Sequence, residues 1–303
     1  MEYVVAGYNM LNDIVYADGT RVDGILGGSV FSLGGIKLWR DSLAYVGVAG
    51  KDYMDHYGPF LTRNNIKASV EPRLEYTLDY VLTYQPDGSW NEACKYGDEW
   101  EDKAYENSRF GADAFAEFVG PDTKGVYIEA SLSTQIIYEF SKLKAMMPNG
   151  KLMWEIVTGD LLDPACHDKL MEIMETVDFY SVNFNEAKVF FNIATEEEAI
   201  EKMLAIGKPC FFRCGDKGAY LINNGNVSFL AAVGVEESVG ETGCGNCSTA
   251  TALIGLAEGL PDMETLAMAN ISAYYCAKQY GPWEYTDEKV RAEATALKDK
   301  LLK

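Results

Sequence analysis

Apolar stretches alternate with amphipathic stretches along most of the chain, and this alternation predicts strands and helices in turn. The first apolar segment predicts a strand over residues 3–8, and a second extended region follows at 14–16. A helix is expected at about 29–39. The apolar run 43–49 predicts the next strand, which a helix at about 54–64 should follow. The amino-terminal part of the chain therefore has a mixed α/β pattern.

Residues 68–96 have a different pattern. Apolar and aromatic side chains alternate with polar ones from Val70 to Tyr84, and Asp87-Gly88 is a typical hairpin turn. Alternation of this kind indicates strands with one face buried and one face exposed, unlike the apolar strands around them. The segment therefore predicts part of a small antiparallel sheet that projects from the main body.

From about residue 112 the chain repeats a strand–helix alternation. Strands are expected at 125–129, 151–156, 178–182, 209–214 and 219–222. Helices are expected at 134–146, 166–175, 186–191, 196–205, 245–258 and 263–279. This order predicts an α/β layered domain with a largely parallel sheet. Ligands of such domains bind where the carboxyl ends of the strands meet helix N-termini.

Composition narrows the range of partners. The chain has 303 residues and a formal net charge of −20, and its negative field repels polyanions. Nucleic acids and acidic membrane surfaces are therefore not expected as partners. No run of 18 apolar residues predicts a membrane span, and the first residues read as a strand rather than a signal peptide. A cytoplasmic location is expected.

Cysteine and histidine usage gives little support to metal or redox chemistry. The seven cysteines are an odd number, which favours reduced thiols that act mostly as small core residues. The two histidines, His56 and His167, have no cysteine cluster beside them. Cys244 and Cys247 have the C-x-x-C spacing of thioredoxin-like sites, but the expected βαβ context is missing. They are interpreted as small residues that fill space.

The strongest local signal is the segment 241–250, with the sequence Glu-Thr-Gly-Cys-Gly-Asn-Cys-Ser-Thr-Ala. Two glycines separated by one residue precede a run of small residues that predicts a helix. Glycine allows a tight turn and a close approach of a ligand to the backbone. The first amides of the helix would then face an anion. By itself, the pattern also fits an ordinary helix entry capped by Thr242 or Asn246.

Together with four other segments, this turn resembles the ribokinase/pfkB family of carbohydrate kinases. The turn is similar to the family motif D-T-x-G-A-G-D, and the other segments follow in the family's order. They are 27–29 (Gly-Gly-Ser), 46–52 (Val-Gly-Val-Ala-Gly-Lys-Asp), 183–187 (Asn-Phe-Asn-Glu-Ala) and 213–219 (Arg-Cys-Gly-Asp-Lys-Gly-Ala). The resemblance implies a ribokinase-like three-layer α/β/α fold over 1–303. It also implies a small β lid formed mainly by about 10–26 and 68–96.

The resemblance further implies roles for individual residues. The catalytic set would be Glu241, Gly243, Cys244, Gly245 and Asn246, with backbone amides facing the transferred phosphoryl group. ATP would be bound by Asn183, Glu186, Arg213, Gly215, Gly218 and Thr242. Glu186 would also organise Mg²⁺, mainly through water. The substrate would be held by Asn12, Asp13, Gly27, Gly28 and Ser32, with Asn12 and Asp13 competing for the family's hydroxyl-binding aspartate position.

Asn246 departs from the family pattern, because it occupies the position of the catalytic aspartate. A carboxylate there can accept the proton of the attacking hydroxyl, whereas a neutral amide cannot. Either the enzyme is active and Glu241, Asp13 or water takes the proton, or the protein has lost catalysis and binds or regulates. A single deliberate substitution is disfavoured, because Gly240-Glu241 replaces the family's opening Asp-Thr and the neighbouring residues differ too.

The expected activity is transfer of the γ-phosphoryl group of ATP to a hydroxyl of a sugar or sugar-like small molecule, with Mg²⁺. Two alternatives remain at this point. One is a nucleoside kinase, and the other is a catalytically silent ligand-binding or regulatory protein. A lid strand that pairs with the same strand of a second copy would form a homodimer.

Overall fold

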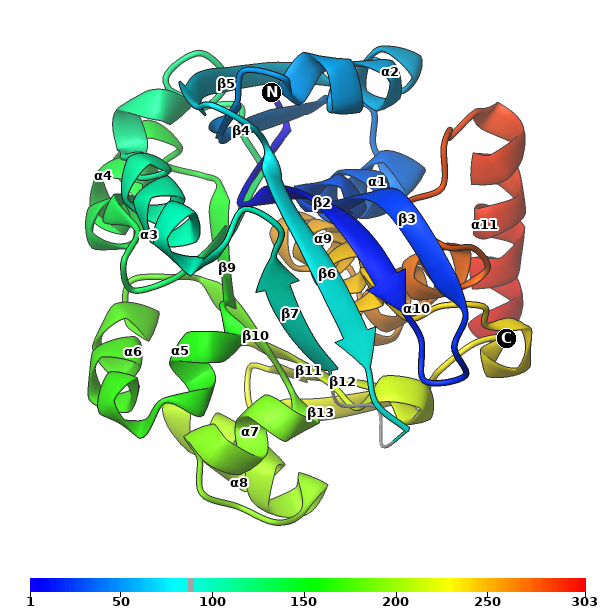
Figure 1. Ribbon diagram of the computed structural model, residues 1–303. Coiled ribbons are helices and arrows are strands. Elements are labelled where there is room, and N and C mark those ends of the chain that lie inside the picture. The colour runs from blue at the N-terminus through cyan, green and yellow to red at the C-terminus, as the bar shows by residue number, and fades with distance from the viewer. Residues whose placement is uncertain (87–89) are drawn as a thin grey trace.

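The computed structural model describes residues 1–86 and 90–303, which fold around two β-sheets (Figure 1). Within these residues the large sheet has nine strands in the order β13-β12-β11-β10-β9-β8-β1-β4-β5. Pairing is parallel from β11 through to β5 and antiparallel at β12 and β13. The strands are β1 (Tyr3–Ala6), β4 (Leu43–Gly50), β5 (Lys67–Leu74), β8 (Gly125–Ala130), β9 (Lys151–Ile156), β10 (Phe179–Asn183), β11 (Cys210–Arg213), β12 (Gly218–Asn223) and β13 (Asn226–Ala231).

Helices cover both faces of the large sheet, and each face has its own apolar core. One core packs beneath α4 (Phe140–Met146), α5 (Thr158–Leu162), α6 (His167–Met174), α7 (Phe184–Phe190) and α8 (Glu196–Ile206). The other packs beneath α1 (Ser29–Trp39), α2 (Tyr53–Arg63), α9 (Cys244–Glu258), α10 (Asp262–Ala277) and α11 (Glu288–Leu301). Alternate residues of β1 enter opposite cores, Val4 the first and Val5 the second, as the two-residue period of a strand requires. The result is the predicted α/β/α arrangement of layers.

The small sheet has the strand order β3-β2-β6-β7 and stands in front of α9 in the view of Figure 1. Its strands are β2 (Asn9–Val15), β3 (Arg21–Gly28), β6 (Leu78–Tyr84) and β7 (Trp90–Cys94), and α3 (Asp98–Asn107) follows them. Buried and less buried residues alternate along β6, which matches the half-exposed pattern of the sequence. The Tyr57 hydroxyl group of α2 donates to the carbonyl of Met10 at 2.6 Å and so anchors this sheet to the main body.

One part of the expected lid is wrong, and another lies outside the described residues. Residues 68–74 do not belong to the small sheet, because β5 pairs in parallel with β4 at the edge of the large sheet. The expected hairpin turn at Asp87-Gly88 lies outside the described residues. The sequence patterns also did not predict α3, β13 or α11. No helix in the described part of the chain is long and apolar enough to cross a membrane.

Candidate active site

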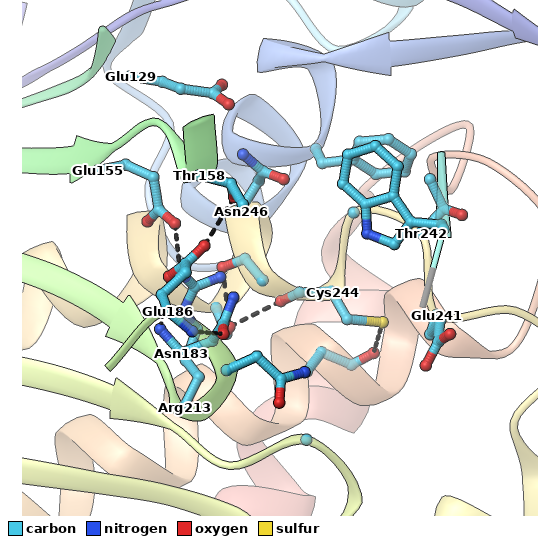
Figure 2. A pocket seen from close by; sticks show the side chains of 18 of the residues that line it. Glu129, Glu155, Thr158, Asn183, Glu186, Arg213, Glu241, Thr242, Cys244 and Asn246 are labelled. Atoms are coloured by element: carbon cyan, nitrogen blue, oxygen red, sulfur yellow. Dashed lines mark hydrogen bonds and ion pairs between the residues drawn. The ribbon is translucent and has the colours of Figure 1, made fainter. Parts of the chain in front are cut away.

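A cavity of about 1110 Å³ lies at the carboxyl ends of β8, β9, β10 and β11, between the large sheet and the small sheet. It is lined from the large sheet by Glu129, Glu155, Asn183 and Arg213, each at or next to the end of its strand. This is the edge where ligands of parallel α/β sheets bind. Figure 2 shows these side chains gathered around the first turn of α9.

The first turn of α9, which the sequence suggested as an anion-binding turn, forms one wall of the cavity. Gly243 precedes the helix in the left-handed conformation with φ 85°, and a Cβ there would lie 2.2 Å from the Phe31 ring. A Cβ at Gly245 would lie 2.2 Å from the Arg213 guanidinium group. Both contacts are so close that only glycine fits without a shift of a neighbour. The packing of the turn therefore requires glycine at positions 243 and 245.

The amides of this turn are not all free to bind an anion. The Cys244 amide donates to the Glu241 carbonyl at 3.1 Å, so its expected role toward a phosphoryl group does not hold in this conformation. The amides of Gly245 and Asn246 make no hydrogen bond to any described residue. Unpaired amides at a helix start have positive partial charge. These two are the better candidates for contact with a phosphoryl group.

Asn183 and Glu186 form a capping box at the start of α7. The Asn183 side chain accepts from the Glu186 amide, and Glu186 Oε2 accepts from the Asn183 amide at 2.7 Å. Glu186 Oε1 accepts from the Thr158 hydroxyl group at 2.7 Å. Each oxygen of Glu186 thus already accepts one hydrogen bond within the protein. The described residues contain no cluster of three or more His, Cys, Asp or Glu that could hold a metal.

Arg213 is a cation enclosed between two acidic side chains. Its guanidinium group lies 2.5 Å from Glu155 Oε1 and 3.7 Å from Glu186 Oε2. Burial raises the pKa of Glu155 to about 8 against the opposing effect of Arg213. Because Arg213 also lies against Gly245, it places a positive charge beside the start of α9. The predicted cofactor-binding set therefore includes a fixed cation.

The structure separates the two competing residues of β2. Asn12 lines the cavity, and its Oδ1 atom is buried without a partner among the described residues. Asp13 faces away and pairs with Arg21 at 3.0 Å and Lys95 at 2.9 Å. The two side chains lie on opposite faces because consecutive residues of a strand alternate in direction. Asp13 is therefore removed from the candidate substrate-binding and proton-accepting residues.

The remaining substrate-side predictions have mixed outcomes. Gly28 lines the cavity in the left-handed conformation with φ 64°, where a Cβ would lie 2.2 Å from the Tyr8 carbonyl oxygen. Gly27 lies directly behind Asn12, since a Cβ there would meet the Asn12 amide at 2.1 Å. Ser32 is fully buried in α1 and does not line the cavity. Gly27 and Ser32 thus support the wall of the cavity from behind.

On the opposite side, Gly215, Gly218, Thr242 and Glu241 line the same cavity. The Thr242 hydroxyl group lies 2.9 Å from that of Tyr84, which connects the small sheet to the turn. Glu241 lies on the far side of Cys244 from Asn246 in Figure 2. The carboxylate of Glu241 is therefore poorly placed to take a proton beside Asn246.

The cavity residues absent from the sequence-based set include Glu129, Glu155 and Thr158, whose polar side chains bear on the chemistry of the site. The carboxylates Glu129 and Glu155 stand at the ends of predicted apolar strands, and a charged residue at that point of a buried strand was a usable signal. Thr158 had no such signal, because its contact with Glu186 joins two separate loops.

Solved structures with the same fold differ in what they bind. A protein from Escherichia coli described as ribokinase II, in complex with ATP and Mg²⁺, has a TM-score of 0.74 and 17% identity, covering 99% of both chains. An adenosine kinase from Sinorhizobium meliloti has a TM-score of 0.75 and 18% identity, covering 97% of this chain and 98% of that one. A pyrophosphate-dependent kinase of the ribokinase family, complexed with a pyrophosphate analog and myo-inositol, has a TM-score of 0.72 and 15% identity, covering 97% and 99%.

The architecture is thus ribokinase-like, which confirms the predicted fold class. The family model described as pfkB family carbohydrate kinase matches residues 126–288. The chain therefore belongs to the pfkB family of carbohydrate kinases, as the five segments predicted. A comparison with curated proteins gives no match.

Proposed function

We propose that the protein transfers the γ-phosphoryl group of ATP to a hydroxyl group of a sugar or sugar-like small molecule. The observation that carries the proposal is one continuous cavity, in which the start of α9 lies between two different sets of residues. Asn12, Gly28 and Trp90 lie on the side of the small sheet. Gly215 and Gly234 lie on the side of β12. A substrate and a phosphoryl donor can therefore meet at one helix N-terminus.

The residues at this junction suit the charge of a phosphoryl group. The free amides of Gly245 and Asn246 and the guanidinium group of Arg213 offer positive potential where charge develops on the transferred oxygens. A Mg²⁺ ion carried by the nucleotide would offset further negative charge, and water between the ion and Glu186 would orient it. The small sheet would act as a lid that excludes water from the donor.

The alternative function is ligand binding without catalysis, because Asn246 cannot take a proton and a protein that had lost catalysis would retain the same cavity. The test is ADP release with ATP and Mg²⁺ across sugars, polyols and nucleosides, with thermal melting measured for each ligand. Turnover with a sugar or polyol supports the proposal. Turnover with nucleosides alone would replace it with a nucleoside kinase, and melting shifts without turnover would replace it with a binding protein.

Two matching capping boxes provide a control for the donor site. Glu186 of α7 lines the cavity, whereas Glu198 of α8 caps its helix in the same way at the protein surface. We expect Glu186→Gln to raise the Mg²⁺–ATP concentration needed for half-maximal rate about tenfold, because a charge-assisted contact is lost. Glu198→Gln should leave that concentration unchanged. Equal effects of the two changes would contradict the assignment of Glu186.

A further inference from the structure

The cavity contains a carboxyl group to which neither the resemblance nor the proposed function gives a role. Glu129 is the fifth of the six residues of β8, and its side chain reaches the cavity. Its Oε2 atom is enclosed and has no hydrogen-bond partner among the described residues. A buried acceptor that lacks a donor is costly in a folded protein. Such an atom at a cavity wall indicates that its partner is supplied by a ligand.

The position of Glu129 within the cavity indicates the kind of partner. Figure 2 shows Glu129 and Asn246 on the same side of the cavity. The Asn246 side chain lies close enough to the Glu129 carboxyl group to stabilise its charged form. Asn246 also donates to the buried Tyr127 hydroxyl group at 3.5 Å. Glu129 is thus the carboxylate next to the place where the family motif has its aspartate.

We propose that Glu129 accepts the proton of the substrate hydroxyl group during phosphoryl transfer, an inference that rests on the proposed function. The hydroxyl oxygen forms a bond to the terminal phosphorus of ATP, and the bond from that phosphorus to the bridging oxygen breaks. ADP leaves with the bonding electrons, and the proton passes to Glu129, which later releases it to water. Asn246 orients the hydroxyl group and does not take the proton.

The electrostatic surroundings suit a group that exchanges protons near neutral pH. Burial raises the pKa of Glu129 to about 7, and Asn246 and Arg213 oppose this rise. Glu92 of β7 raises it further. The other ionisable groups that face Glu129 are Glu155 on β9, Tyr127 on β8 and Tyr45 on β4. A general base with a pKa near the working pH is ionised in a large fraction of the molecules and still binds the proton strongly enough to accept it.

Two other acidic side chains suggested by the sequence are less suited to this role. Glu241 lies on the opposite side of the first turn of α9 in Figure 2. Asp13 is held in ion pairs with Arg21 and Lys95, outside the cavity. Neither of them takes the place of Glu129, whose carboxyl group interacts with the Asn246 side chain.

The test compares the full-length wild type with Glu129→Gln, Asn246→Asp and the double variant, in ADP release with the best acceptor found. We expect E129Q to lower kcat about 100-fold, because general bases contribute about 10²–10⁴-fold and positioning dominates phosphoryl transfer. It should also abolish the fall of kcat below about pH 7. The kcat of the double variant should be at least tenfold higher than that of E129Q, because N246D introduces a carboxylate that can take the proton.

Glu92→Gln is the matched control, because Glu92 is a second carboxyl group at the wall of the same cavity. It should keep the acidic limb of the pH profile, with a midpoint at lower pH because the charge of Glu92 no longer raises the pKa of Glu129. The inference is overturned if E129Q raises only the KM of the acceptor and keeps both kcat and the limb, since Glu129 would then only bind the substrate. It is also overturned if the wild type is silent and N246D alone is active.

The failure of the proposed function has a different signature, in which neither the wild type nor N246D turns over any acceptor. Cooperative urea unfolding of each variant establishes that it is folded. If E129Q does not fold, Glu129→Asp replaces it, with a shorter side chain that keeps the acid. E129D should lower kcat and keep the acidic limb, and an unchanged kcat would overturn the inference.

Discussion

Gly243 and Gly259 stand at the two ends of α9 in the same left-handed backbone conformation, but their surroundings differ. Their φ angles are 85° and 67°. A Cβ at Gly243 would lie 2.2 Å from the Phe31 ring, whereas no described atom lies within 4 Å of a Cβ at Gly259. Alanine at Gly259 therefore measures the cost of the backbone alone. Alanine at Gly243 measures that cost together with a steric clash.

The magnitudes follow from these contacts. A left-handed conformation costs a residue other than glycine about 1–2 kcal/mol, so Gly259→Ala should lower the free energy of unfolding by about that amount. Overpacking adds typically about 1–3 kcal/mol, so Gly243→Ala should lower it by about 2–5 kcal/mol. Phe31 also lines the cavity, and a displaced ring would narrow the space for ligands. G243A should therefore lose ligand binding as well as stability.

Urea unfolding followed by tryptophan fluorescence measures the first effect, provided that the slope of the transition is equal in all proteins. Ligand-induced shifts of the melting temperature measure the second effect. G259A should keep the ligand shifts of the wild type. Equal loss of stability in the two variants, with ligand shifts preserved in both, would show that the turn does not pack against Phe31 as described.

Two further predictions concern the contact between the sheets and the stability in acid. Tyr84→Phe removes the hydrogen bond to Thr242, which is worth about 1 kcal/mol, and should raise the KM of the acceptor about fivefold in steady-state kinetics. Tyr76→Phe, at an exposed tyrosine, should leave this KM unchanged. Equal KM values for the two variants would contradict a lid contact. Hydrogen bonding from Arg40 lowers the pKa of Glu258 to about 2. The ionised Glu258 stabilises the folded protein by about 3 kcal/mol above its unfolded-state pKa near 4.5, and this stabilisation is lost as the pH falls toward 2. In Glu258→Gln, the free energy of unfolding measured in urea should therefore fall less steeply with decreasing pH.

The layered fold was predictable from sequence because buried parallel strands and their helices repeat a simple pattern. β4, for example, is buried at every residue and reads as one apolar run. The assignment of residues 68–74 to the small sheet was wrong for a physical reason. A half-exposed edge strand of the large sheet has the same two-residue alternation as a strand of a small sheet. Only its pairing with β4 distinguishes the two, and that pairing is not local.

The site was less predictable, because several of its features depend on where a side chain or a backbone amide points rather than on residue type. Asn12 and Asp13 are neighbours with similar side chains, and the face of β2 on which each lies decides which one enters the cavity. The turn at Gly243 was recognisable from its glycines. That Cys244 uses its amide internally was not, because the Glu241 carbonyl is placed by the fold of the loop.

The exchange of aspartate for asparagine at position 246 has an electrostatic consequence for its neighbour. An aspartate there would place a second carboxylate beside Glu129, and like charges at such a distance raise the pKa of one of the pair. A neutral amide removes that repulsion and stabilises the charged form of Glu129 instead. In the mechanism we propose, the residue that cannot take the proton at position 246 therefore favours the ionised form of Glu129, which can. Loss of the family's aspartate and retention of phosphoryl transfer are compatible for this reason.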